Sequence, residues 1–295
     1  AKQMETHKTN PVLGFRTAGS DAEHKTGDFL YEEMKRIGLQ NVTKDEFWLD
    51  SWTFERAVLR FQDQHGELHT CQMNFETDGF ETYDLVYVGR GTASDYEGLN
   101  VRGKLVLADI NQRDEWWINY PVYQAYLKGA VGLIAVQTQG YAEIDPRALN
   151  AQDIAGPEYA PAFSLSRQDA SYLKELLCPE DPAVSHPSSV AVELNASSWV
   201  ERNRPAYNIT GYLPGTAASE EDERMILLSA HYDSYFDGFQ DDNCAVSMTF
   251  GIIKALIDSG YQPLPKSGVS VILNLTGQPE PGIRYSVFTR NGRAA

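Results

Sequence analysis

The sequence predicts an α/β protein of two domains. Helix and strand patterns alternate near both ends of the chain, whereas the middle consists of short strands and turns. An apolar run, a helical pattern and a second apolar run follow one another near the C-terminus, which is the order of a parallel β-α-β unit. At 295 residues the chain is also longer than a single compact domain usually is.

The first predicted element is a helix over residues 21–37. Ser20 followed by Glu23 is a capping-box pattern, in which two side chains satisfy free amides at the start of a helix. Apolar residues then recur at near-helical spacing, and Gly38 supplies the left-handed residue that commonly ends a helix. The run VTKDEFWL after it is typical of a strand.

The middle of the chain, from about residue 55, predicts mostly β-structure. Residues 56–73 have the pattern of a β-hairpin, and we place its turn at 64–66, where Gly66 stands. The remaining predictions for this region are a helix over 122–128, a strand that ends at Val136, a helix over 166–177 and a proline-rich linker over 178–189.

The C-terminal region predicts part of an α/β sheet. The run Met225-Ile226-Leu227-Leu228 belongs to a strand whose unbroken apolar pattern is typical of burial on both faces. A helix pattern over 244–261 and a strand pattern over 268–277 follow it. Strand, loop, helix and strand together predict a β-α-β unit.

The composition excludes several classes of function. The formal net charge is −16, which argues against binding to nucleic acid or to anionic lipid, because both need a basic face. No apolar stretch approaches the roughly 20 residues of a membrane-spanning helix. Cys71, Cys178 and Cys244 lie far apart and form neither a disulfide framework nor a CxxC zinc pattern. The cellular compartment stays open.

One short stretch, AHYDSYFDGFQDDNCA at 230–245, gathers chemically active side chains. His231 falls at the carboxyl end of a predicted strand, where open α/β sheets bind ligands. Asp233 follows two residues later, and Asp241 and Asp242 stand just before the predicted helix. Imidazole and carboxylate are ligands that Zn²⁺ accepts. Two interpretations are open at this point, a solvated acidic loop and half of a metal site.

Three stretches resemble one family of enzymes. LLSAHYDSYFDGFQDDNCAVS is similar to the H-x-D and D-N signature of the co-catalytic zinc aminopeptidases, the superfamily of aminopeptidase Y, bacterial leucyl aminopeptidase and glutamate carboxypeptidase. FRTAGSDAEHKTGDFLYEEMKRIGLQNV resembles the opening helix segment of that family. RGKLVLADI followed by AYLKGAVGLIAV resembles the protease-associated domain that is often inserted in these enzymes.

The resemblance implies a fold and a domain order. We expect an α/β, mixed-sheet zinc-peptidase domain of the phosphorylase/hydrolase-like type, incomplete in this chain and formed by residues 1–54 and 196–295. A β-rich α+β protease-associated domain, residues 55–195, is expected to be inserted between the two pieces.

The resemblance also implies roles for three residues. His231 would bind one of two zinc ions, and Asp242 would bridge both. Asp233 would be the catalytic-site carboxylate that bonds His231 and fixes its orientation. Asp242 is preferred to Asp241 because the bridging residue of the family directly precedes the Asn-type step into the helix.

The chain departs from the family pattern after residue 276. A working member has an adjacent Glu-Glu pair after the next strand, then an Asp and a His that complete the two coordination spheres. The sequence NLTGQPEPGIRYSVFTRNGRAA contains no adjacent pair, and Glu280 is the acid nearest the expected place. Three explanations are open: a truncated or frame-disrupted copy, which we favour, a non-catalytic relative, or a site completed by another subunit.

The function implied is that of a zinc-dependent exopeptidase, most simply an aminopeptidase that removes N-terminal residues from peptides. The alternative is a non-catalytic scaffold that binds proteins through its protease-associated domain. We expect a peptide partner and neither nucleic acid nor membrane. The sequence does not fix the side-chain preference, the choice between amino- and carboxypeptidase action, or the oligomeric state.

Overall fold

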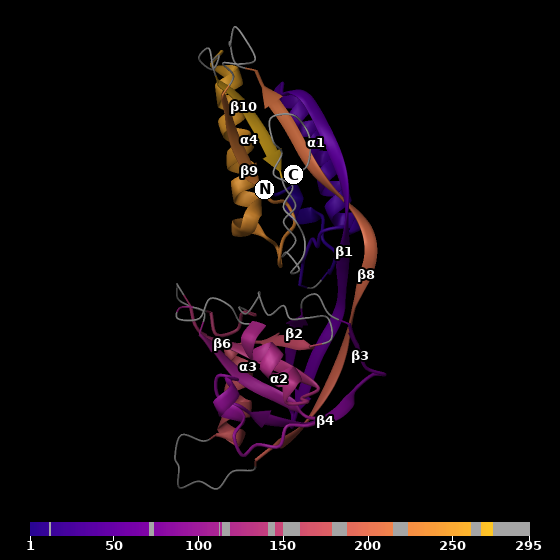
Figure 1. Cartoon of the computed structure of the whole chain (residues 1–295), viewed down its shortest axis with the longest axis vertical. Helices are drawn as coiled ribbons and strands as arrows, with labels where there is room; N and C mark the ends of the chain where they lie inside the picture. Colours follow the sequence, from indigo (N-terminus) through magenta and orange to yellow (C-terminus); the bar gives the residue numbers. More distant parts are fainter. Residues whose placement is uncertain are drawn as a thin grey trace. The chain divides into compact units, whose positions relative to one another are not determined.

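The computed structural model describes residues 1–11, 13–70, 74–111, 113, 119–140, 145–149, 160–178, 188–214, 224–260 and 267–273 (Figure 1). The chain divides into two compact units. The first contains residues 1–9, 14–49 and 205–295, and the second contains 10–13 and 50–204. The domain limits expected from the sequence, 1–54 with 196–295 and 55–195, remain a prediction.

Among the described residues, the first unit contains two α-helices and a small mixed sheet. Its elements are the short helix η1 (Met4–Thr6), α1 (Asp21–Ile37), the beginning of β1 (Gln40–Phe61), the end of β8 (Val190–Leu213), β9 (Arg224–Ala230), the turn η4 (Phe239–Cys244), α4 (Ala245–Asp258) and β10 (Ser267–Leu273).

Helix α1 begins and ends where the sequence predicts. The Ser20 hydroxyl accepts a hydrogen bond from the Glu23 amide at 3.2 Å, which is the N-cap half of the predicted capping box. The other half does not form, because the Ser20 amide donates to the carbonyl of Thr17 and the Glu23 carboxylate bonds Tyr232. Gly38 ends the helix with φ of +100°, a conformation that residues with a Cβ rarely adopt. Leu30 and Met34 on its buried face join the apolar core of the unit.

The predicted β-α-β unit is confirmed. β9 and β10 are parallel, with Ile226 opposite Val269, and α4 connects them and packs against β9 and α1. β10 is also antiparallel to β8, which makes the sheet mixed. The core is shared among the helices and strands of this unit; its buried members include Leu30, Met34, Ala206, Ile209, Tyr232, Val246 and Ile253.

The prediction that β9 is buried on both faces is wrong for its middle residues. Ile226 and Leu227, which point to opposite faces of the sheet, are 53% and 52% exposed. Burial on both faces needs neighbouring strands and a helix layer on each side. In the part of the chain that the structure describes, β9 pairs with β10 alone, so it is an edge strand.

The second unit is a β-rich α+β structure. Strands β4 to β7 are parallel to one another, in the order β4-β5-β6-β7, and their apolar side chains are buried. Its elements besides parts of β1 and β8 are β2 (Gln64–Thr70), β3 (Phe75–Glu76), β4 (Glu81–Tyr87), η2 (Ala93–Tyr96), β5 (Leu105–Asn111), α2 (Asn119–Leu127), β6 (Gly132–Gln139), β7 (Ala162–Leu165) and α3 (Arg167–Leu177).

The predicted hairpin between β1 and β2 forms, but its turn lies two residues earlier than expected. Phe61 pairs with Gln64, which places Gln62 and Asp63 in the turn. Gly66 belongs instead to β2, where a Cβ would lie 2.7 Å from Cδ1 of Leu165 in the neighbouring strand. This glycine therefore serves close packing between strands and not a turn.

The other predictions for this unit fall partly within the described residues. α2 and α3 form close to their predicted ranges, and Ser166 caps α3 through the amide of Asp169 at 3.0 Å. Most of the predicted linker, 179–187, lies outside the described residues. None of the helices in the described ranges is long and apolar enough to span a membrane.

Candidate metal centre

The carboxyl end of β9 places His231 between acidic side chains. The strand ends at Ala230, so the imidazole stands directly after it. Its Nδ1 lies 2.9 Å from Oδ1 of Asp233. On the other side of the ring, Nε2 lies 2.8 Å from Oδ1 of Asp241 and 3.8 Å from Oδ2 of Asp242. The structure therefore brings together the four side chains that the sequence singled out in the stretch 230–245.

Asp241 and Asp242 face the same ring nitrogen in different ways. The Asp241 side chain is 65% exposed, whereas that of Asp242 is 21% exposed. Oδ2 of Asp242 also accepts a hydrogen bond from the backbone amide of His231 at 3.2 Å. Asp242 is thus held against the end of β9, and Asp241 reaches the ring from the solvent side. The choice of Asp242 as the bridging ligand remains a prediction.

The surroundings of His231 favour a positive charge on the ring. Burial alone lowers its pKa, but the hydrogen bonds with Asp233 and Asp241 raise that pKa to about 10. Burial raises the pKa of Asp233, against the opposing effect of His231, and the bond to His231 lowers the pKa of Asp241. A field that favours a proton at a ring nitrogen favours a metal cation there as well.

A buried arginine holds the loop that carries these residues. Arg16 is 1% exposed, and its guanidinium donates to the carbonyls of Tyr232 and Met4 and to the side chain of Asn243. Arg16 and Asn243 were not predicted to take part in the site. No local sequence pattern predicts their roles, because Arg16 bonds Tyr232 and Asn243, which lie 216 and 227 residues further along the chain.

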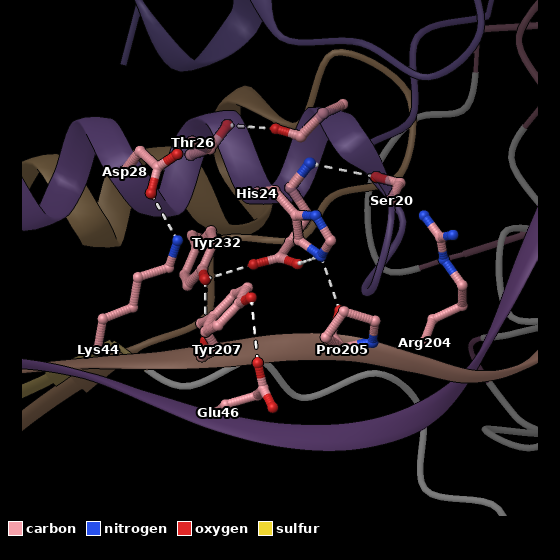
Figure 2. Close-up of polar contacts among 12 residues, drawn as sticks. Ser20, His24, Thr26, Asp28, Lys44, Glu46, Arg204, Pro205, Tyr207 and Tyr232 are labelled. Atoms are coloured by element: carbon pink, nitrogen blue, oxygen red, sulfur yellow. Dashed lines mark hydrogen bonds and ion pairs between the residues drawn. The ribbon is translucent and has the colours of Figure 1, made fainter.

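On the other side of the same chain segment, Tyr232 is anchored to α1 and β8 (Figure 2). Its hydroxyl lies 2.5 Å from Oε1 of Glu23 and 2.9 Å from the carbonyl oxygen of Tyr207. Burial raises the pKa of Glu23 to about 7, against the opposing bond from Tyr232. The second oxygen of Glu23 is buried without a hydrogen-bond partner, and His24 Nε2 stands 3.5 Å from it.

The donor atoms present fit zinc in kind. An imidazole nitrogen and carboxylate oxygens are its usual ligands where thiolates are absent. No group of three or more His, Cys, Asp or Glu side chains with the arrangement of a metal site exists within the described ranges. The region after residue 273, where the Glu-Glu pair was sought and where Glu280 stands, lies outside the described residues. The described residues thus provide part of a ligand set.

Comparisons with known proteins bear on the fold of the chain. The family model of the PA domain matches residues 81–173. "Probable leucine aminopeptidase 2" of Aspergillus oryzae (strain ATCC 42149 / RIB 40) is 27% identical over 245 residues, which are 82% of this chain and 45% of that protein.

Solved structures of peptidases superpose on nearly the whole chain. Peptidase M28 precursor from Shewanella amazonensis SB2B gives a TM-score of 0.65 at 18% identity, covering 93% of this chain and 62% of the solved one. BSAP, a zinc aminopeptidase from Bacillus subtilis, gives 0.61 at 17% identity, covering 92% and 59%. This chain has the zinc aminopeptidase fold, with a PA domain. The resemblance and the fold class indicated by the sequence are confirmed.

The extent of the match is also a finding. The chain spans 45% of the length of the curated relative and about three fifths of each solved chain, 62% and 59%. The activity of a whole enzyme therefore stands as a proposal for this chain.

Proposed function

We propose that this chain is a zinc-dependent exopeptidase of the aminopeptidase type, acting on peptides with a free amino terminus. One observation carries the proposal: Nε2 of His231 and Oδ2 of Asp242 lie 3.8 Å apart at the carboxyl end of β9, with Asp233 bonded to the other ring nitrogen. The aminopeptidase names of the relatives support the substrate class.

His231 and Asp242 would hold the metal, and Asp233 would orient the first of them. Because Nδ1 of the ring faces the Asp233 carboxylate at 2.9 Å, Nε2 is directed toward Asp241 and Asp242. Zinc, when bound, polarises a scissile carbonyl and makes a bound water more acidic. The part that this chain contributes is to fix one ring nitrogen and one carboxylate oxygen on the same side of the sheet edge.

Metal binding and hydrolysis test the proposal together. The purified chain is titrated with Zn²⁺ and with Co²⁺, whose visible spectrum reports its ligands. Hydrolysis is then followed on a short peptide and on the same peptide acetylated at its amino terminus. Metal binding with cleavage of the free peptide alone supports an aminopeptidase. Cleavage of both peptides to the same extent, or neither binding nor cleavage, contradicts it.

The second candidate is a non-catalytic scaffold that uses the PA domain for protein contact. The observation that favours it is the lack of a group of three metal-binding side chains in the described part of the chain. A chain that binds no metal and cleaves no peptide, yet unfolds cooperatively, is the result expected of the scaffold.

A further inference from the structure

One buried side chain contacts both segments that carry the predicted ligands. Nε of Arg16 donates to the carbonyl oxygen of Tyr232, and Nη2 donates to Oδ1 of Asn243, each at 2.5 Å. Tyr232 directly follows His231, and Asn243 directly follows Asp242. We infer that Arg16 is a positioning residue that sets the separation of His231 and Asp242. The inference rests on the proposed metal-binding role of those two residues.

The third guanidinium nitrogen and the backbone of Arg16 are hydrogen-bonded as well. Nη1 donates to the carbonyl of Met4 at 2.6 Å. The backbone amide of Arg16 donates to the carbonyl of Ser234 at 2.9 Å, and the amide of Ser234 donates back at 3.0 Å. One residue before, the amide of Phe15 donates to Phe236 at 2.9 Å. The backbone at Phe15 and Arg16 is thus hydrogen-bonded to the loop after β9, which the Arg16 side chain also contacts.

Gly14 allows this close approach. A Cβ at this position would lie 2.6 Å from the carbonyl carbon of Phe236, and the residue has φ of +88°. Only glycine combines that backbone conformation with so little space. The segment before α1 is therefore shaped to lie against the loop after β9.

Asn243 links Arg16 to the loop before α4 through hydrogen bonds with Asp237 and Gly238. Its side chain is fully buried, and while Oδ1 accepts from Arg16, Nδ2 donates to the carbonyl of Asp237 at 3.2 Å. Its backbone amide donates to Gly238 at 3.1 Å. The residue that follows Asp242 is consequently held at three atoms, which limits where the Asp242 carboxylate can lie.

The chemistry of arginine suits this task better than that of lysine. A guanidinium presents several donors in one rigid plane, so it reaches acceptors on three chain segments at once, whereas an ammonium is a single point. Burial lowers the pKa of Arg16 to about 10, which leaves it charged at neutral pH, and Asp233 opposes that decrease. Hydrogen bonds from a charged donor are shorter and stronger than neutral ones.

The competing explanation is that Arg16 only stabilises the fold. The two explanations differ in what happens to the His231 ring when the protein stays folded. A positioning residue that is changed leaves the ring free to adopt several orientations, whereas a stabilising residue that is changed lowers the unfolding midpoint and leaves the ring environment intact. Met34 offers the matched control, because it is fully buried in the same unit and its apolar side chain donates no hydrogen bond to either segment of the site.

The experiment compares the wild-type chain with Arg16→Lys and with Met34→Ala. The first measurement needs no metal: ring nitrogen–proton correlation spectra of the ¹⁵N-labelled chain, with the signals of His231 among six histidines assigned by their loss in His231→Gln. The second measurement is a Co²⁺ titration. Urea unfolding of each variant gives the stability against which both are compared.

We expect Arg16→Lys to broaden or shift the His231 ring signals and to lower Co²⁺ affinity about tenfold, the usual effect of losing a residue that orients a ligand. Met34→Ala should lower stability and leave both readouts at their wild-type values. If the wild-type chain binds no Co²⁺, the proposed function fails, yet altered ring signals in Arg16→Lys still support the positioning role.

Two results overturn the inference: wild-type ring signals in a folded Arg16→Lys chain, or the same ring changes in Met34→Ala. If Arg16→Lys does not fold, Asn243→Ala replaces it, since that change removes one acceptor and leaves the two carbonyl partners of Arg16 in place. Ring signals that broaden or shift in folded Asn243→Ala support the positioning role, and unchanged signals contradict it.

Discussion

Each unit of the protein contains a tyrosine that donates to a carboxylate, but only one of the two pairs includes a cation. In the second unit, Tyr87 donates to Asp109 at 2.8 Å, and Lys174 reaches the same carboxylate at 2.7 Å. In the first unit, Tyr232 contacts Glu23 at 2.5 Å, and burial raises the Glu23 pKa to about 7. The charge of Asp109 is balanced by Lys174, whereas Glu23 becomes neutral by binding a proton.

The same difference extends to the candidate metal centre. Within the described residues, no lysine or arginine forms an ion pair with Glu23, Asp233, Asp241 or Asp242. A cluster that supplies its own cation, such as Asp109 with Lys174, has the charge of its acid balanced within the fold. A cluster whose acids face one imidazole has charge left for an added cation. The comparison thus separates an acid paired with a lysine from acids that have no lysine or arginine ion pair among the described residues.

Removal of His231 should have the largest effect. His231→Ala deletes the one nitrogen ligand of the predicted site, so Co²⁺ affinity should fall about 1,000-fold, given the several kcal/mol that each ligand contributes to a zinc site. Competition with a chelator of known affinity measures the loss. Asp109→Asn is the control from the second unit and should retain wild-type affinity, and equal losses in both variants would remove the distinction between the clusters.

The protonation of Glu23 should appear in the pH dependence of stability. The Tyr232 hydroxyl has a single proton but lies within hydrogen-bond distance of two oxygens, one on Glu23 and one on the carbonyl of Tyr207. Both hydrogen bonds can form when Glu23 is protonated, because its carboxyl group then donates the second proton. The folded-state pKa of about 7 lies above the ordinary value of 4.5. The protonated Glu23 therefore contributes to the free energy of unfolding. This contribution is fully present below pH 4.5 and is lost as the pH rises through 7, which lowers the free energy of unfolding by about 3 kcal/mol.

Glu23→Gln should flatten that part of the profile, because glutamine stays neutral at every pH. Urea unfolding at several pH values between 4 and 8 is the measurement. Glu81→Gln is the matched control: Glu81 also accepts from a tyrosine, Tyr83, at 2.7 Å, but it is exposed and its pKa is lowered. If the free energy of unfolding falls with pH as steeply in Glu23→Gln as in Glu81→Gln, Glu23 is ionised in the folded protein.

The two tyrosine hydroxyls should differ in their contribution to stability. Tyr232→Phe leaves a buried carboxyl and a carbonyl without their donor and should cost about 2 kcal/mol. Tyr87→Phe should cost about 1 kcal/mol, because Lys174 still bonds Asp109. Unfolding free energies at pH 7 measure both. A larger loss in Tyr87→Phe would reverse the comparison on which the two clusters were distinguished.

The sequence predicted elements whose signals are local. Helix α1 has its cap, its apolar face and its stop glycine within Ser20–Gly38, and the position of His231 after a strand follows from the apolar run before it. The turn at Gln62–Asp63 was misplaced because Gly66 is required by packing against Leu165, a contact with a distant strand. Partners far along the chain leave no periodic pattern.

Arg16 shows the same limit at the candidate site. Arginine is almost never fully buried without a partner, so composition places it at the surface. Its burial here depends on Met4, Tyr232 and Asn243, which come from three separate segments. The burial of β9 was overestimated for a related reason, since an apolar run does not state which strands lie beside it. Tertiary neighbours, and not local propensity, decide both cases.

The smallest expected effect concerns the choice between the two adjacent aspartates. Asp242→Asn should lower Co²⁺ affinity about tenfold, because the carboxylate is held at the end of β9 by the His231 amide and cannot be replaced by solvent. Asp241→Asn should change the affinity less than about threefold, since an exposed carboxylate is well solvated and contributes little to a pair. Parallel Co²⁺ titrations of the two variants measure the difference, and the amide keeps the size of each side chain. A greater loss in Asp241→Asn would transfer the predicted bridging role to Asp241, whose oxygen lies nearer to Nε2 of His231, at 2.8 Å.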